Sequence, residues 1–248
     1  MLSGQDLPDK GICAHRGASF SHPENTLSAF KKAIDLGVQM IEFDVRLTSD
    51  SVLVILHDTD LSRTTGLNAK VSKVPFMEIR KLDAGFWKDK KFIGEKIPTL
   101  EEVLDLIPRN IWMNIHIKGE KEIAIKTAIV LKKREQLNNA ILAVDAAGAL
   151  EEIRKIDSRF IICCMDRKDS PQAYVNEAIR IEADFIQLTL REMPVLDVII
   201  PQLKNHNIKI NFYFADEIET VKKIFDSGVD FVLVNDVEKI MSQLKKDH

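Results

Sequence analysis

Residues 39–56, QMIEFDVRLTSDSVLVIL, contain two apolar runs typical of β-strands, at 39–47 and 52–56. Only the four residues TSDS separate them. A parallel crossover needs a dozen or more residues, so the two runs are predicted to form an antiparallel hairpin. Only one of the two can then belong to a parallel sheet.

Short β-branched runs alternate with stretches of helical periodicity along the whole chain, which is typical of βα units around a parallel sheet. Nine runs are predicted to be strands, and the hairpin removes one of them from the count. The remaining eight indicate an α/β fold, a (β/α)₈ barrel. The predicted strands are 11–15, 39–47, 52–56, 111–117, 140–145, 159–164, 184–188, 208–213 and 230–235, and the predicted helices include 26–37, 99–107, 120–134, 171–181, 194–206, 216–227 and 236–245.

The length of the chain, 248 residues, is usual for one such barrel, so a single domain over residues 1–248 is expected. The stretch 57–98 has weak periodicity and its own aromatic residues, Phe86, Trp87 and Phe92. We interpret it as an insertion at the C-terminal mouth of the barrel, where the active sites of such barrels lie.

The composition argues against several kinds of partner. The formal charge is −3 and the pI is about 6.1, so no global field would attract nucleic acid or anionic lipid. No run approaches the roughly 18 apolar residues of a membrane span, so no stable membrane insertion is expected. A small molecule is the expected partner. The expected location is the cytoplasm, or the periplasm or exterior if a signal peptide has been removed.

Glu42 and Asp44 are two residues apart in a predicted strand, so both side chains leave the same face, roughly 7 Å apart along the strand. Phe43 faces the other way. Two acids that point into a barrel mouth repel each other unless a cation or a shared proton neutralises them. The pair predicts a divalent metal site, with solvated acids on a half-exposed strand as the alternative.

Asn114, His116 and Lys118 alternate with apolar residues in the predicted strand 111–117 and just beyond it, so they share one face. Histidine is a common metal ligand, and Lys118 is suited to a phosphate oxygen as a point charge. The alternative for His116 is a strand-end histidine bonded to a backbone carbonyl.

Two further histidines end predicted strands. His15 ends the strand 11–15 and is followed by Arg16, and His57 follows the strand 52–56. Two histidines at one mouth can share general acid and base duties near neutral pH, while Arg16 holds a phosphate in bidentate fashion. A lone histidine would more often be structural.

The segment Pro23-Glu24-Asn25-Thr26 leads into the predicted helix 26–37. Asn25 or Thr26 can cap the first turn of this helix, and Glu24 complements the helix dipole. Glu24 can equally turn toward the metal, and we predict that it is among the residues that contact the substrate.

In order and spacing, six motifs of this chain resemble those of the glycerophosphodiester phosphodiesterases. The dense match covers roughly residues 11–118, and the combination is highly specific although each fragment is weak alone. The motifs are His15-Arg16-Gly17, Pro23-Glu24-Asn25-Thr26, Ile41-Glu42-Phe43-Asp44-Val45, His57-Asp58, Arg63-Thr64-Thr65 and Ile97-Pro98-Thr99-Leu100-Glu101-Glu102.

The resemblance implies a (β/α)₈ barrel related to phosphatidylinositol-specific phospholipase C. It also implies hydrolysis of glycerophosphodiesters to sn-glycerol 3-phosphate and an alcohol, with one divalent metal ion, usually calcium or magnesium. The implied roles are acid/base catalysis for His15 and His57, metal binding for Glu42 and Asp44, and phosphate binding for Arg16 and Lys118.

Two positions depart from the family pattern. The family typically has a glutamate where this chain has His116. Calcium and magnesium prefer oxygen ligands while imidazole suits transition metals, so we predict a preference for an ion such as zinc or manganese. The family also usually has a tryptophan and polar residues in the strand 208–213. Here Tyr213 or Phe212 is expected to form the aromatic wall of the alcohol pocket.

Two alternative functions are also compatible with the sequence. The first is a lysophospholipid phosphodiesterase of the same barrel type, because an aromatic-rich insertion would suit a lipid chain. The second is a domain that binds phosphodiesters without turning them over, because His116 replaces a carboxylate ligand.

Overall fold

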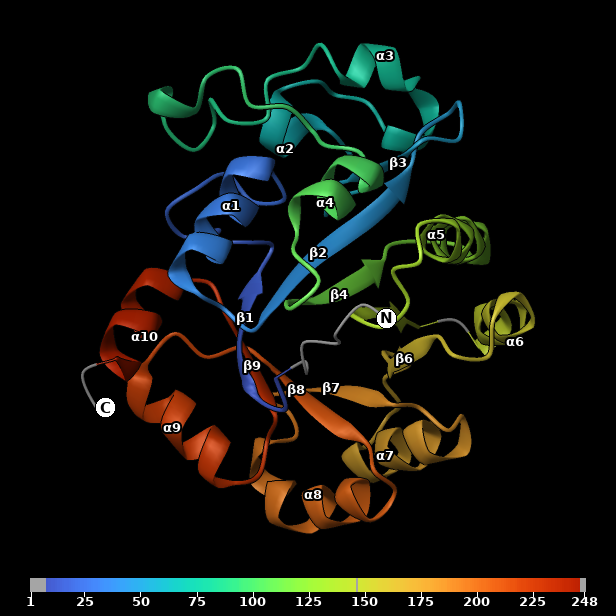
Figure 1. Ribbon diagram of the computed structural model, residues 1–248, viewed down its shortest axis with the longest axis vertical. Coiled ribbons are helices and arrows are strands. Elements are labelled where there is room, and N and C mark those ends of the chain that lie inside the picture. Colours follow the sequence, from blue (N-terminus) through green and yellow to red (C-terminus); the bar gives the residue numbers. More distant parts are fainter. Residues whose placement is uncertain (1–7, 146, 246–248) are drawn as a thin grey trace.

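Eight parallel strands close into a barrel in the computed structural model, which describes residues 8–145 and 147–245 (Figure 1). The order around the barrel is β1-β9-β8-β7-β6-β5-β4-β2, and β1 pairs with β2 to close it. The predicted (β/α)₈ barrel is confirmed. The strands are β1 (Gly11–His15), β2 (Met40–Leu47), β3 (Leu53–Ile55), β4 (Trp112–Ile117), β5 (Ala140–Val144), β6 (Ile161–Cys164), β7 (Phe185–Thr189), β8 (Lys209–Tyr213) and β9 (Phe231–Val234).

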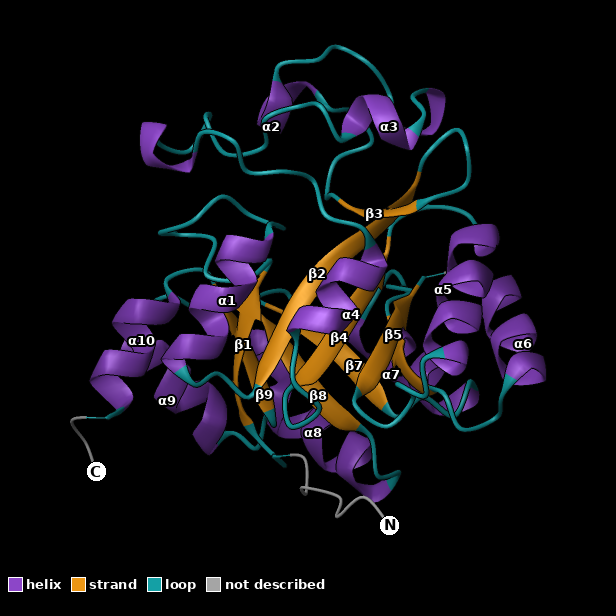
Figure 2. Cartoon of the chain, turned by 45° about the horizontal axis from the view of Figure 1, so that its top comes forward, coloured by secondary structure: helices purple, strands orange, loops and turns teal. Residues whose placement is uncertain are grey.

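The predicted hairpin is also present. β3 pairs antiparallel with the end of β2, with Val45 opposite Ile55 and Leu47 opposite Leu53. β3 therefore lies outside the barrel order. It leads the chain into the segment 57–98, which lies above the C-terminal ends of the strands (Figure 2).

Helices cover the outside of the barrel, and each predicted helix lies within two residues of an observed one at both ends. The helix α6 was not among those predicted. The ends of the predicted domain, 1–7 and 246–248, lie outside the described residues. The outer helices are α1 (Leu27–Leu36), α4 (Leu100–Leu106), α5 (Lys121–Lys133), α6 (Ala147–Ile156), α7 (Pro171–Arg180), α8 (Leu196–Asn205), α9 (Ile218–Asp226) and α10 (Val237–Leu244), with a 3₁₀ turn η3 (Met193–Val195) before α8.

Side chains of β2 alternate between the helix layer and the barrel interior. Phe43 is fully buried on the outer side and its ring lies 5.7 Å from that of Phe30 in α1. Met40 faces inward and packs with the interior cluster. Glu42 and Asp44 follow Met40 on the same face. This alternation places the two acids above the apolar floor of the barrel.

The floor of the barrel is built from large inward side chains. Trp112 and Phe185 have ring centroids 5.8 Å apart, and Phe185 lies 6.3 Å from Phe231. The cluster closes the interior below the acids, so polar chemistry is confined to the C-terminal mouth. The cluster comprises Cys13, Met40, Trp112, Ile141, Ala143, Cys163, Met165, Phe185, Phe231 and Leu233.

The insertion 57–98 packs around an aliphatic core of its own rather than around its aromatic residues. Phe86 and Trp87 are 59% and 36% exposed, and Phe92 contacts the ring of His22. The insertion contains α2 (Ser62–Thr65), η1 (Val71–Lys73), α3 (Phe76–Ile79) and η2 (Lys90–Phe92). Its residues Leu61, Val71, Ile79, Ala84 and Ile97 form this core together with Val54 and Leu56, which precede the insertion.

Within residues 8–145 and 147–245, no helix combines the length and the apolar character that crossing a bilayer requires.

Candidate active site and metal centre

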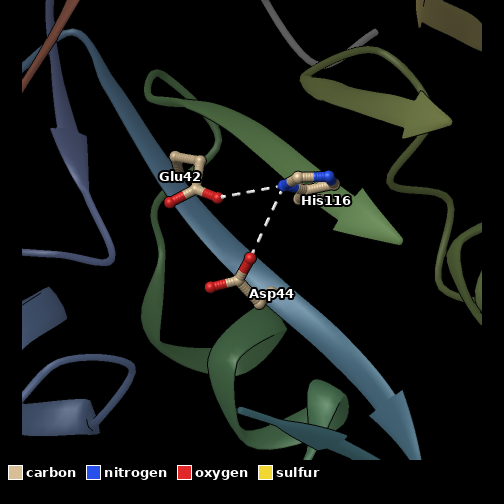
Figure 3. A group of neighbouring side chains, drawn as sticks. All are labelled: Glu42, Asp44 and His116. Carbon is tan, nitrogen blue, oxygen red and sulfur yellow. Dashed lines mark ion pairs between the residues drawn. The ribbon is translucent and has the colours of Figure 1, made fainter. Parts of the chain in front are cut away.

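Two neighbouring strands bring three potential metal ligands together. Glu42 and Asp44 lie on β2, and the parallel register with β4 sets His116 opposite Asp44. His116 Nδ1 is 3.8 Å from Glu42 Oε1 and 3.5 Å from Asp44 Oδ1 (Figure 3). One ligand atom from each residue lies within 4.8 Å of the other two. This spacing fits a single divalent cation.

The two acids of this group are buried, and their pKa values are shifted in opposite directions. Glu42 and Asp44 are only 3% and 1% exposed, which argues against the alternative of solvated acids. Burial and the charge of Asp44 raise the pKa of Glu42 well above its usual value. Burial also acts on Asp44, but the charges of Lys118 and Arg16 outweigh it, and the pKa of that carboxyl is lowered.

One oxygen of Asp44 lacks a hydrogen-bond donor. Asp44 Oδ1 is buried and lies 3.3 Å from Lys118 Nζ, but without the geometry of a hydrogen bond. Burial, followed by the charge of Lys118, lowers the pKa of His116 to about 3, so its imidazole is neutral. A neutral imidazole and a carboxylate oxygen with a free lone pair suit a cation, so the residues present fit a divalent metal.

His15 lies at the end of β1 beside Glu42, with Nε2 3.9 Å from Glu42 Oε2. Its Nδ1 is 2.7 Å from Asn235 Oδ1, and Asn235 Nδ2 donates to Asp216 Oδ2 at 2.8 Å. Because Asn235 uses its amide hydrogens on Asp216, its oxygen accepts from His15. The hydrogen bonds therefore assign the proton to Nδ1 and leave Nε2 facing the acids.

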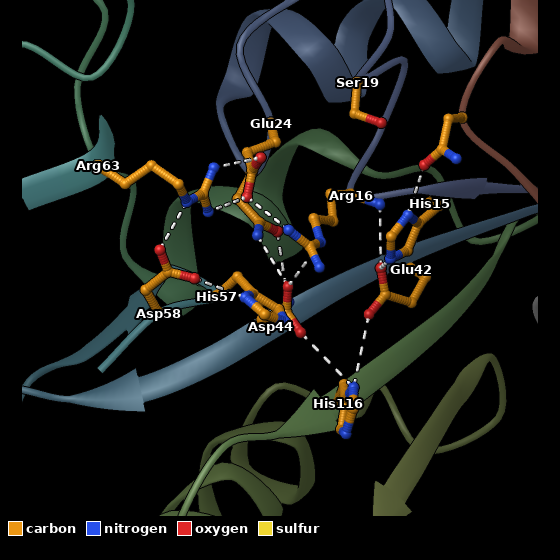
Figure 4. A network of polar contacts seen from close by, with 12 residues as sticks. His15, Arg16, Ser19, Glu24, Glu42, Asp44, His57, Asp58, Arg63 and His116 are labelled. Atoms are coloured by element: carbon orange, nitrogen blue, oxygen red, sulfur yellow. Dashed lines mark hydrogen bonds and ion pairs between the residues drawn. The ribbon is translucent and has the colours of Figure 1, made fainter. Parts of the chain in front are cut away.

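His57 lies on the same rim, beside Asp44 (Figure 4). The backbone N–H of Leu56 donates to Asp44 O at 3.0 Å, which fixes the end of β3 against β2. His57 Nδ1 is 2.7 Å from Asp58 Oδ1. The structure thus brings both histidines to the mouth that holds the acidic pair.

Arg16 is held close to the acids by backbone and side-chain contacts. Its backbone has a positive φ of 56°, and its N–H donates to Glu42 Oε2 at 2.9 Å. Its Nη1 donates to Glu24 Oε1 at 2.7 Å, and its Nε is 3.5 Å from Asp44 Oδ2. Glu24 faces arginine and is not among the three clustered ligands. Arg16 Nε and Lys118 Nζ both lie within ion-pair distance of Asp44, at 3.5 and 3.3 Å.

Tyr213 and Phe212 lie on opposite faces of β8. The ring of Tyr213 is half-buried and packs edge-on against His15, with centroids 5.0 Å apart. Phe212 is fully buried and belongs to the cluster between the barrel and its helices. Tyr213 therefore lies at the mouth, and the alternative that Phe212 lines the pocket is wrong, because neighbouring residues of a strand point to opposite faces.

Sequence reasoning missed the site contacts of two residues, Asn25 and Arg46. Asn25 contacts one of the acids, and Arg46 contacts the backbone at two strand ends. Asn25 Nδ2 donates to Asp44 Oδ2 at 2.9 Å, while the capping of α1 falls to Thr26. Arg46 Nε donates to His57 O at 2.8 Å and its Nη1 donates to Lys118 O at 3.2 Å. A signal for Arg46 was available, since it follows Asp44 by two residues on the inward face.

Asn235 and Asp216, the partners of His15, were also missed. Neither belongs to a motif that the sequence displays, and Asn235 lies 220 positions from His15. The signal was their place at or just after the ends of predicted strands, because residues at the C-terminal ends of barrel strands collect at the mouth.

Comparisons with known proteins find relatives that align over nearly the whole chain. The chain is 33% identical over 247 residues to a glycerophosphodiester phosphodiesterase of Caldanaerobacter subterraneus, covering 95% of this chain and 98% of that protein. It superposes with a TM-score of 0.85 on an Oleispira antarctica phosphodiesterase in complex with the product sn-glycerol-3-phosphate, at 26% identity, covering 96% of this chain and 97% of the other.

A partial relative is a human lysophospholipase D, which is 36% identical over 127 residues, or 49% of this chain and 40% of that protein. The sequence model of the glycerophosphoryl diester phosphodiesterase family matches residues 15–239. Because that match spans most of the chain and the bacterial relative aligns over nearly its whole length, this chain belongs to the glycerophosphoryl diester phosphodiesterase family of hydrolases.

Proposed function

We propose that this chain hydrolyses glycerophosphodiesters to sn-glycerol 3-phosphate and an alcohol, with a bound divalent metal ion and with His15 and His57 as the acid/base pair. The observation that carries the proposal is the meeting of both imidazoles with the buried Glu42–Asp44 pair at one rim. The relative that binds sn-glycerol-3-phosphate supports the product assignment.

The metal would be held by Glu42, Asp44 and His116, whose ligand atoms already converge. When bound, a divalent cation supplies Lewis-acid stabilisation of the negative charge that develops on the phosphate. Arg16 and Lys118 lie within ion-pair distance of Asp44 and are placed to bind the remaining phosphate oxygens.

The histidines move the protons. The oxygen of water, or the 2-hydroxyl of the substrate's own glycerol, attacks phosphorus, and one histidine accepts its proton. The P–O bond to the alcohol breaks, and the other histidine protonates that oxygen as it leaves. Each transfer is worth about 10²–10⁴-fold. Attack by the 2-hydroxyl passes through a cyclic phosphate, which water then opens to sn-glycerol 3-phosphate.

The metal requirement is tested by removing the metal with EDTA and adding back calcium, magnesium, manganese or zinc. Glycerophosphocholine and glycerophosphoethanolamine are the substrates, and sn-glycerol 3-phosphate is the measured product. We expect manganese or zinc to restore most of the turnover, because the imidazole of His116 replaces an oxygen ligand and makes the ligand set less negative by one unit. Elemental analysis of the purified protein identifies the resident metal.

The matched variant for this experiment is His116→Glu. It is expected to shift restoration toward calcium or magnesium, because it supplies a third carboxylate. Restoration of wild-type turnover mainly by calcium would contradict the transition-metal preference. Binding of substrate without turnover, whichever metal is supplied, would favour the non-catalytic alternative.

A lysophospholipid is the second candidate substrate, and one observation favours it. Phe20 and Phe86 are 64% and 59% exposed, and they belong to the loop that follows β1 and to the insertion that follows β3. The human relative named a lysophospholipase D adds support. If an acyl chain packs on these rings, kcat/KM for lysophosphatidylcholine should exceed that for glycerophosphocholine, and Phe86→Ser should lower only the former. Equal losses for both substrates would exclude this candidate.

A further inference from the structure

Arg63, in α2 of the insertion, connects two sides of the site through two carboxylates (Figure 4). Its Nε donates to Asp58 Oδ2 at 2.6 Å, and Asp58 Oδ1 is 2.7 Å from His57 Nδ1. Its Nη1 and Nη2 donate to Glu24 at 2.9 and 2.8 Å, and Glu24 accepts from Arg16 at 2.7 Å. One guanidinium thus reaches a histidine and an arginine of the site, each through one acid.

The geometry requires a guanidinium. The two carboxylates occupy different edges of the planar group, with Asp58 on Nε and Glu24 on the two terminal nitrogens. The five donors of arginine point in fixed directions, whereas the ammonium of lysine is a single point charge. A lysine at position 63 could reach one of the two acids but could not hold both in these orientations.

Arg63 favours the ionised form of both acids. Its hydrogen bond is the main cause that lowers the pKa of Asp58 to about 2. Burial raises the pKa of Glu24, but the hydrogen bond from Arg63 and the charge of Arg16 outweigh it and lower that pKa. Asp58 is therefore a full acceptor for the Nδ1 hydrogen of His57 across the working pH range.

The contact with Asp58 determines which ring nitrogen of His57 carries the hydrogen. A carboxylate at Nδ1 keeps the hydrogen on that nitrogen and leaves Nε2 for the substrate. The side chain of Asp58 is 30% exposed and is a neighbour of His57 in sequence, so the backbone alone leaves it free to turn toward solvent. The hydrogen bond from Arg63 Nε holds the second carboxylate oxygen of Asp58, Oδ2, in place.

The insertion in turn fixes Arg63. The ring of Trp87 lies 5.8 Å from Arg63 Cζ, and Lys88 Nζ donates to Ser19 O, in the loop after β1, at 2.8 Å. The insertion thereby contacts the site from two separate segments, one that carries Arg63 and one that covers it. The insertion would then help to position site residues as well as cover the mouth of the barrel.

We propose that Arg63 is a positioning residue of this enzyme, which orients His57 through Asp58 and Arg16 through Glu24 so that the insertion completes the site. The proposal rests on the proposed function, because that function assigns the acid/base role of His57 and the phosphate-binding role of Arg16.

The test compares Arg63→Met with Arg80→Met under metal saturation. Arg80 is a matched control, because it lies in the same insertion, bonds Glu102 and stacks 5.1 Å over Phe76 without touching the site. We expect Arg63→Met to lower kcat by about 10- to 100-fold, as expected for a misplaced catalytic group. KM should also rise, because Glu24 would no longer be held by Arg63 and Arg16 would be less well placed to bind the phosphate. Arg80→Met should lower only the melting temperature.

Two further variants keep the test decisive if Arg63→Met folds poorly. Arg63→Lys should fold and show an intermediate kcat, since it can hold only one acid. Asp58→Asn should lower kcat, and adding Arg63→Lys to it should cost little more, because both act on His57 through one contact. The ¹⁵N ring shifts of His57, assigned by comparison with His57→Asn, should show loss of the fixed Nδ1–H tautomer in Arg63→Met.

The outcomes separate the two proposals. If the Arg63 variants keep wild-type kcat and KM and lose only thermal stability, as Arg80→Met does, Arg63 merely fastens the insertion and the inference is overturned. If His57→Asn itself turns over at the wild-type rate, the proposed acid/base role fails instead.

Discussion

Replacing His57 with asparagine is expected to lower kcat by about 10²–10⁴-fold, because asparagine can neither accept nor donate a proton during turnover. The residue is not among the clustered metal ligands, so metal content should not change. Its carbonyl still accepts from Arg46, which keeps the end of β3 in place. Steady-state kinetics under metal saturation, with elemental analysis of the same sample, measure both quantities.

The control for this variant is His206→Asn. His206 ends α8 on the protein surface, where its Nδ1 bonds the carbonyl of Gln202. We expect this variant to keep the wild-type kcat. A kcat of His57→Asn equal to that of the control would contradict the acid/base role, whatever the metal content.

The inward placement of the acids could be predicted because it depends only on strand geometry. The two-residue repeat of β2 puts Glu42 and Asp44 on one face and Phe43 on the other. The parallel pairing with β4 then sets His116 opposite Asp44. Neither step needs contacts between distant loops, so the candidate ligands were available from the sequence.

The groups that orient these residues could not be predicted in the same way. Asn235 meets His15 only because β9 closes the barrel against β1, a contact 220 positions apart in sequence. Asn25 was one of two candidates to cap α1, and the structure gives that role to Thr26 and turns Asn25 toward Asp44. Such choices depend on tertiary packing, which local propensity does not encode.

The helix α6 and the core of the insertion could not be predicted either, because their local sequence signals are weak. The sequence AAGALEEIRKI has small residues and a glycine where a helix usually carries a capping side chain. In the insertion, Leu61, Val71, Ile79 and Ile97 meet in one cluster although their spacing fits no single period. The aromatic residues gave a stronger local signal, yet Phe86 is exposed.

Replacing Glu42 with glutamine is expected to weaken metal binding by at least about 100-fold, since loss of a direct ligand should cost no less than loss of an outer-shell partner. Turnover at a fixed, limiting metal concentration should fall in parallel. The amide oxygen of glutamine can still accept the hydrogen bond from the backbone N–H of Arg16, so the local fold has no reason to change. Titration of EDTA-treated protein with manganese or zinc measures the loss.

The same variant should be at least as stable as the wild type when both are free of metal at neutral pH. Burial and the charge of Asp44 raise the pKa of Glu42 well above its unfolded value. A carboxyl with a raised folded pKa stabilises the fold fully below its unfolded pKa, and that stability is lost as pH rises through the folded pKa. Glutamine does not titrate, so the variant avoids this loss. Urea unfolding across pH measures it, with Glu101→Gln on α4 as the control.

This pair of results would separate a metal site from a structural carboxylate. If Glu42 serves mainly to anchor the backbone of Arg16, glutamine should leave metal binding intact, and any effect should be a loss of metal-free stability. If Glu42 is a ligand, the wild type gains stability from added metal in proportion to its affinity, and the variant loses that gain while its metal-free stability holds. A metal-free Glu42→Gln protein that is less stable than the wild type at neutral pH, yet binds metal equally well, would contradict the assignment of the Glu42–Asp44–His116 cluster as the metal centre.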